Sequence, residues 1–180
     1  MKIQTRFGEV ELIDEGQVGY SFGSQDNKYQ YPSEINFSEE PRPPVVLGIK
    51  LNSAPLIAFG GYGIGIQIGP HLSIALSDRL FVVFKRWLIC IDLATHQLLW
   101  SIEADPINCF GLYHSSEHSA LITHGELEVA RFDEDGAKLW HTSGADIFSE
   151  GFKLEPDSIL VVDFNGTKYR YSYDGGLRMA

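Results

Sequence analysis

Cysteines, basic residues and long apolar runs are scarce in this sequence of 180 residues. Its two cysteines, Cys90 and Cys109, are too few to indicate the disulfide framework of a small secreted domain. No apolar run approaches the roughly 20 residues that a transmembrane helix requires. Residues 1–6 also lack the apolar core of a secretory signal peptide. We therefore expect a cytoplasmic protein with reduced thiols.

The shortage of basic residues sets the charge of the chain. Lys and Arg number 14 against 24 Asp and Glu, which gives a formal net charge of −10 and an isoelectric point near 4.9. The phosphates of nucleic acids and of anionic membranes repel such a charge, so we expect neither as a partner. The same field attracts a basic protein and speeds its encounter, although a charge of this size also serves solubility alone.

Aromatic residues and glycines are abundant, at 12% and 18 residues. Aromatic side chains pack well on pleated surfaces and glycines serve turns, so this composition favours β structure. Residues 1–20 alternate in the manner of a hairpin. Ile64, Ile66 and Ile68 also recur with a period of two, which predicts a strand there.

Residues 21–44 differ from the rest in being polar, turn-rich and closed by three prolines. Prolines cannot enter a ladder or a helix interior, so a long loop is expected. Tyr29, Tyr31 and Phe37 are isolated aromatics that would pin this loop to the body of the protein. The glycine-rich stretch 60–65 follows, but no frame of it gives G-x-G-x-x-G and no helix pattern comes after it, which argues against nucleotide binding.

The clearest pattern is an all-β repeat of about forty residues. Each copy has short apolar runs separated by turns. The first two copies then continue through an Asp-containing turn to a strand that bears Leu-Trp. Trp100 and Trp140 lie 40 positions apart. One such sheet cannot bury both faces alone, so the next copy is expected to cover it, with the tryptophan supplying much of the contact. We place the copies at about 72–105, 109–146 and 148–176.

Two segments carry a resemblance to a known family. Asp92-Leu93-Ala94-Thr95-His96-Gln97-Leu98-Leu99-Trp100 and Asp133-Glu134-Asp135-Gly136-Ala137-Lys138-Leu139-Trp140 resemble the blade signature of quinoprotein-type (PQQ-like) β-propellers. The resemblance covers roughly residues 72–176. His96 stands where glycine is usual, and the third copy stops before any tryptophan. Enzymes of this family hold a quinone and a metal at the axis of a full ring of blades. None of those ligand motifs can be placed here, so the resemblance implies no cofactor and no site residues.

We therefore predict an all-β fold, a small or incomplete β-propeller-like array of antiparallel four-stranded sheets. Residues 1–70 would form an N-terminal β segment that serves as a divergent blade or a cap, and residues 71–180 would hold the three repeats. A ring of four to eight blades needs about 160 to 320 residues. The sheets either close with the help of the N-terminal strands, which we favour, or stay open and cover their edges by oligomerising.

One literal match to a catalytic motif is His114-Ser115-Ser116-Glu117-His118, which fits the H-x-x-E-H pattern of zinc proteases. That chemistry needs both histidines on one face of a helix. The segment instead joins two apolar strand runs and is rich in serine, which predicts a hairpin turn. We therefore assign no metal ligand, and a metal-dependent hydrolase that uses His114, Glu117 and His118 stays an alternative.

Acidic residues gather in the second repeat, with Arg131 among them. The run 133–136 lacks the alternating ligands of an EF-hand loop, so a turn accounts for it. A solvated face is one interpretation of such carboxylates, and a docking surface for a basic partner is the other. The candidate partner-binding residues are Glu126, Glu128, Asp133, Glu134 and Asp135.

Three functional hypotheses follow. The first is a non-enzymatic module that presents an acidic β-repeat surface to a protein partner, with an immunity-type inhibitor of a basic toxin as one such role. The second is the metal-dependent hydrolase, and the third is a structural scaffold that associates with itself through sheet edges. We favour the first, with no catalytic residue and no cofactor.

Overall fold

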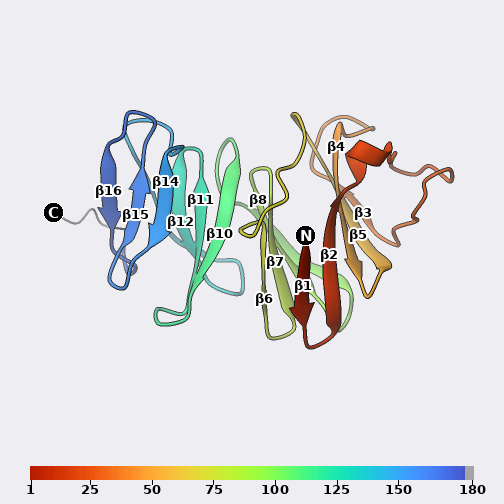
Figure 1. Ribbon diagram of the computed structural model, residues 1–180, viewed down its shortest axis with the longest axis horizontal. Helices are drawn as coiled ribbons and strands as arrows, with labels where there is room; N and C mark the ends of the chain where they lie inside the picture. Colours follow the sequence, from red (N-terminus) through yellow and green to blue (C-terminus); the bar gives the residue numbers. More distant parts are fainter. Residues whose placement is uncertain (177–180) are drawn as a thin grey trace. The chain divides into compact units, whose positions relative to one another are not determined.

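The computed structural model describes residues 1–176, and within them the regular secondary structure is almost entirely β-strand (Figure 1). The one helix in this range is a single 3-10 turn, and no helix there has the length and hydrophobicity to cross a membrane. The strands form four sheets, one with five strands, two with four and one with three. Contacts divide the chain into two compact units. The first unit comprises Met1–Pro70, Ala75–Arg79 and Asp92–Gln97, and the second comprises the remaining segments.

The five-stranded sheet belongs to the first unit and has the order β1-β2-β4-β5-β3. Its strands are β1 (Lys2–Thr5), β2 (Gly8–Asp14), β3 (Glu34–Asn36), β4 (Val45–Leu51) and β5 (Ala54–Gly61). Three neighbouring pairs are antiparallel, and β3 lies parallel to β5. Alternate residues of β2, β4 and β5 point into the core, where Leu12, Ile49 and Phe59 are almost completely buried.

Two local predictions for the first unit are wrong. After β2 the chain turns through η1 (Glu15–Val18) rather than continuing as a strand, because Asp14 caps the turn by accepting the N–H of Gly16 at 3.1 Å. Residues 62–70 also form no strand. Gly63 and Gly65 have φ values of +81° and +59°, which a β-ladder does not accommodate, and they leave Ile64 fully exposed.

The long loop of residues 21–44 is pinned to this sheet, as its aromatic residues predict. The buried hydroxyl of Tyr31 donates to Glu15 Oε1 at 2.5 Å, and Phe37 stacks on Phe59 with ring centroids 5.9 Å apart. Gly48 makes room for the first contact, since a Cβ there would overlap the Tyr31 hydroxyl. Burial, reinforced by the hydrogen bond to Glu15, raises the pKa of Tyr31 far above its usual range, so this hydroxyl stays protonated.

Three further sheets follow along the chain, with the orders β6-β7-β8-β9, β10-β11-β12-β13 and β14-β15-β16. The strands of the first of these are β6 (Ser73–Leu76), β7 (Arg79–Phe84), β8 (Trp87–Asp92) and β9 (Gln97–Glu103). Those of the second are β10 (Cys109–Ser115), β11 (Ala120–Gly125), β12 (Glu128–Phe132) and β13 (Lys138–Ser143). Those of the third are β14 (Gly151–Leu154), β15 (Ile159–Val162) and β16 (Lys168–Tyr171).

Each of these sheets contains a turn closed by an aspartate. Oδ1 of Asp92 accepts the N–H groups of the residues two and three positions later, at 2.8 and 2.7 Å. Asp133 and Asp163 each accept from the residues two and four positions later, at 3.0 and 2.8 Å. Asp92 and Asp133 therefore hold hairpin turns, as the repeat in the sequence predicts, and Asp163 holds a turn of the third sheet in the same way.

The tryptophans of the repeat pack on glycines of the following turn. A Cβ on Gly136 would come within 2.9 Å of the Trp100 ring, and a Cβ on Gly176 within 2.6 Å of the Trp140 ring. The Trp140 ring joins an apolar cluster between the second and third of these sheets that includes Phe148, Tyr169 and Tyr171. Successive repeats of the second unit are thereby joined through their aromatic residues, as the sequence predicts.

Candidate functional site

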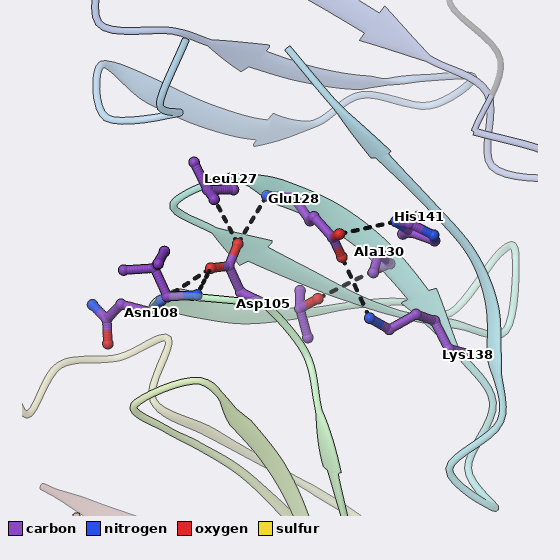
Figure 2. Close-up of polar contacts among 9 residues, drawn as sticks. Asp105, Asn108, Leu127, Glu128, Ala130, Lys138 and His141 are labelled. Atoms are coloured by element: carbon purple, nitrogen blue, oxygen red, sulfur yellow. Dashed lines mark hydrogen bonds and ion pairs between the residues drawn. The ribbon is translucent and has the colours of Figure 1, made fainter. Parts of the chain in front are cut away.

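Glu128 is the most constrained of the five predicted partner-binding residues (Figure 2). Its carboxylate is largely buried and contacts Lys138 Nζ at 3.3 Å and His141 Nδ1 at 3.1 Å, both from the neighbouring strand β13. A carboxylate that already contacts a lysine and a histidine of its own sheet has fewer acceptor positions left for a partner. Its role is to support the pairing of β12 with β13.

The other four predicted residues lie at two ends of β12. Asp133 caps its own turn, in which Glu134 and Asp135 are exposed. Glu126 lies in the turn that precedes β12, where its N–H donates to Asn108 O at 2.8 Å. With a rise of about 3.3 Å per residue, the two ends of this segment are about 25 Å apart. The five carboxylates therefore do not form one continuous surface.

Asp105 is a buried polar centre that the sequence reasoning missed (Figure 2). Its Oδ1 accepts the N–H groups of Ile107 and Asn108 at 2.7 and 2.9 Å, and its Oδ2 accepts those of Leu127 and Glu128, both at 2.8 Å. The carboxylate is fully buried. It clamps the connection that leads into β10 to the β11–β12 turn, and all its contacts are structural.

A signal for this clamp exists in the sequence. Asp105 precedes a proline directly after the strand that carries Trp100, and Asp146 stands 41 positions later in the next connection. Asp146 repeats the arrangement in part, since its Oδ2 accepts from Asn165 Nδ2 at 2.6 Å in a turn of the next sheet. Both aspartates accept hydrogen bonds that hold these connections in place.

The His114–His118 segment forms the hairpin between β10 and β11, as predicted. His114 lies in β10 opposite Leu121. His118 lies in the turn, with its ring stacked on Tyr173 at 3.8 Å and its Nε2 2.8 Å from Pro156 O. The two histidines do not share a helical face, and within residues 1–176 no group of three His, Cys, Asp or Glu side chains is placed to hold a metal ion.

A row of stacked rings crosses the second unit instead. His71 stacks on Tyr113 at 4.4 Å, Tyr113 contacts Phe152 at 4.3 Å, and Phe152 stacks on His124 at 4.7 Å. Tyr113 and Phe152 come from β10 and β14, the first strands of two successive sheets. Contacts of this kind stabilise beyond the area that they bury, so the row is a rigid support across several strands.

Burial disfavours the charged forms of His124 and Cys109 in this region. Burial lowers the pKa of His124 to about 4, although the hydrogen bond to Phe148 O at 2.8 Å opposes the shift. Since a carbonyl only accepts, His124 Nε2 carries the proton of the neutral ring. Burial also raises the pKa of the Cys109 thiol to about 12. A thiol that stays protonated is a poor nucleophile, so neither group provides catalytic chemistry.

Phe110 sits on this support and faces outward. The register of β10 against β11 shifts between Cys109 and Gly111, which makes Phe110 the extra residue of a β-bulge. Its ring rests edge-on against His124, with centroids 5.4 Å apart, and 43% of the residue is exposed. Ile107, 47% exposed, lies in the connection that leads into β10. We call Ile107, Phe110 and the adjoining Glu126 the bulge patch. The sequence contains its residues but no pattern that marks the bulge.

Each unit also has a hollow. In the first unit a hollow of about 420 Å³ lies against Phe7, Leu51, Leu56, Leu93, Ala94 and His96. In the second unit a hollow of about 550 Å³ lies against Thr142, Ser143, Gly144, Ala145, Tyr169, Tyr171 and Gly176. Neither contains a carboxylate or an amine, and histidine is present only in the first. Their lining suits apolar or aromatic groups.

Comparisons with known proteins bear on the fold. No family model and no curated protein matches the chain. Many solved structures match the chain, among them three with low sequence identity. BamB from Moraxella catarrhalis is 15% identical, with a TM-score of 0.50 over 60% of this chain and 33% of that one. The computationally designed Ika4 is 12% identical, with a TM-score of 0.53 over 64% and 73%, and Ika8 is 13% identical, with 0.55 over 76% and 45%.

These likenesses concern only part of some of the matched proteins. The chain spans a third of the length of BamB and less than half of that of Ika8. Identities this low establish architecture and leave activity open. The fold is accordingly an all-β, propeller-like array of sheets that are antiparallel apart from the β3–β5 pair, as the repeat in the sequence predicts.

Proposed function

We propose that this chain is a non-enzymatic binding module of PQQ-like repeats that presents the bulge patch to a basic protein partner. The observation that carries the proposal is the position of Phe110, an aromatic residue turned outward by a β-bulge and backed by His124. Bulges commonly re-aim a side chain at functional positions. Neutralisation of a basic toxin by an immunity-type inhibitor is the specific role that we propose for such a surface.

The backing of Phe110 favours binding over a chance exposure. A single exposed hydrophobic residue is ordinary on a protein surface. Phe110 differs because its ring rests on His124, which itself stacks on Phe152. A partner that covers Phe110 therefore has little side-chain motion to freeze, and aromatic anchors of this kind are enriched at the centres of interfaces.

Charge supports a basic partner. Glu126 is the acidic member of the bulge patch and is held there by its backbone contact with Asn108, and the whole chain carries a formal charge of −10. A carboxylate at the rim of an apolar anchor contributes to the rate and salt dependence of association more than to its strength. Glu134 and Asp135 lie at the far end of β12, so the proposal assigns them long-range attraction and no contact.

The test compares two exposed phenylalanines. Phe110→Ser should lower affinity for a captured partner at least tenfold, about 1.4 kcal/mol. Phe164→Ser is the matched control, because Phe164 is 63% exposed in the β15–β16 turn of the third sheet and is expected to leave affinity unchanged. Equal effects of the two variants at equal thermal stability would contradict the proposal.

A further inference from the structure

The second and third repeats share a contact between a tryptophan and a turn. Gly136 lies 36 positions after Trp100, and Gly176 lies 36 positions after Trp140. Both glycines have left-handed backbone, with φ values of +91° and +60°, and each lies under the indole of its tryptophan. Trp140 Nε1 also donates to Tyr173 O at 2.6 Å. An indole thus covers the turn that follows the third strand of each of these repeats.

The first repeat has the same turn and lacks the indole. His96 occupies the position 40 residues before Gly136, and its φ of +62° shows the same left-handed backbone. The residue 36 positions before His96 is Gly60. A side chain at Gly60 could not replace the tryptophan, because its Cβ would overlap the ring of Pro43.

The hollow of the first unit lies against the turn that no indole covers. Its lining includes Leu93 and His96, which stand 80 positions before Tyr173 and Gly176. Those two residues of the third repeat are the ones that Trp140 contacts. The hollow and the indole sites therefore use equivalent positions of the repeat.

The residues that line the hollow limit the chemical class of its ligand. Phe7, Leu51 and Leu56 supply apolar surface, and Asn52 and His96 supply polar atoms, without any carboxylate, ammonium or guanidinium group among the lining residues. A fixed charge on a ligand would lose its hydration there without gaining a partner of opposite sign. A neutral ring with one hydrogen-bond donor loses little hydration free energy when it enters the hollow. A volume of about 420 Å³ is at the small end of the range for ligand pockets, which suits one side chain.

We infer that this hollow is a vacant indole site that receives a tryptophan side chain from a partner protein. We infer tryptophan as the occupant because a tryptophan covers the equivalent turn in the second and third repeats. The inference adds a second contact to the proposed protein-binding function and rests on it. It concerns the first unit alone and uses none of the bulge patch.

The test titrates the full chain with N-acetyl-tryptophanamide and follows backbone amide resonances. The expected result is a saturable shift at Ala94 and His96, with a midpoint at least tenfold lower than that for N-acetyl-leucinamide. Shifts that do not saturate, or equal midpoints for the two probes, would overturn the inference. The titration reports on the hollow directly. A failure to bind the probe while Phe110→Ser still weakens partner binding would overturn this inference alone. Probe binding without an effect of Phe110→Ser would instead contradict the proposed role of the bulge patch.

Variants that fill the hollow give a second readout. Ala94 and Ala54 are both exposed at its lining, so Ala94→Trp or Ala54→Trp places an indole there without disturbing the core. Each should abolish the saturable shift, and the second serves if the first does not fold. Ala137→Trp, an exposed site in the β12–β13 turn, is the matched control and should retain probe binding. Probe binding that survives both filling variants would contradict the assignment.

Discussion

The indole of Trp100 lies against Gly136, close enough that a Cβ on the glycine would approach its ring to 2.9 Å. The same relationship links Trp140 to Gly176, 40 positions further along the chain. In each case the turn must have a residue that tolerates positive φ and has no side chain. The contact therefore depends on the absence of a side chain at the glycine as much as on the tryptophan itself.

Gly136→Ala tests this contact. An L-residue in left-handed backbone costs about 1–2 kcal/mol, and displacement of the Trp100 ring adds to that cost. Gly166→Ala isolates the backbone part, because Gly166 has a φ of +80° and no neighbour within 4 Å of the added Cβ. We expect Gly136→Ala to lower the free energy of unfolding by about 1–3 kcal/mol more than Gly166→Ala, measured by urea unfolding. Equal losses of unfolding free energy in the two variants would show that the Trp100 ring moves aside without destabilising the protein.

Asp105→Asn tests the buried clamp. An amide keeps one acceptor oxygen but turns an NH₂ group toward two of the four backbone donors, so at least one buried donor loses its partner. Leaving a buried donor unsatisfied costs about 1–3 kcal/mol, and the loss of charge assistance adds to it. We expect a loss of about 3 kcal/mol in the free energy of unfolding. Faster hydrogen exchange at Leu127 and Glu128 would locate the effect, and unchanged exchange there would contradict it.

His124 makes stability depend on pH. Well above pH 6.5 the residue is neutral in both folded and unfolded chains and contributes nothing to the pH dependence. As the pH falls from 6.5 toward 4, the unfolded chain takes up a proton that the folded chain does not, because burial holds the folded pKa near 4. Stability should fall by about 3 kcal/mol over this window from this residue, and little more below pH 4.

A His124→Gln variant separates this contribution from that of other groups. Glutamine has an NH₂ group that can donate to Phe148 O but does not titrate. The difference in unfolding free energy between the two proteins should change by about 3 kcal/mol between pH 7 and pH 4. A difference that stays constant over this range would mean that His124 is protonated in the folded protein.

Tyr31→Phe tests the anchor of the long loop. The substitution removes the hydroxyl that donates to the buried carboxylate of Glu15, so that carboxylate loses a hydrogen-bond donor. We expect a loss of about 1–3 kcal/mol and faster proteolysis within residues 21–44. Tyr29→Phe is the control, since Tyr29 is only half-buried and its ring lies over Lys50. Equal proteolysis of the two variants would contradict an anchoring role for Tyr31.

The repeat was predictable from sequence because its signals are local. An aspartate, a turn residue and a tryptophan at fixed spacing determine the turns at Asp92 and Asp133 and the pairing of the strands around them. The strand predicted around Ile64 is wrong although its signal is local as well. Alternation alone favours a strand, and the left-handed conformations of Gly63 and Gly65 override it.

The candidate site was less predictable because it depends on register. Phe110 is the single extra residue of the bulge in β10, and neither composition nor residue spacing predicts a bulge there. The acidic residues were visible in the sequence, but their positions on either side of β12 and the pairing of Glu128 with Lys138 appear only in the folded chain. The hollow beside His96 could not be predicted either, because residues from separate segments of the folded chain line it.

The most direct test of the binding function places a photo-crosslinking benzoylphenylalanine at position 110 in cells that make the protein naturally, with position 164 as the matched site. Both positions carry exposed phenylalanines, so the two proteins differ only in where the probe is presented. The proposal predicts a discrete protein adduct from position 110 that position 164 does not give. No adduct from position 110, or the same adducts from both positions, would contradict it.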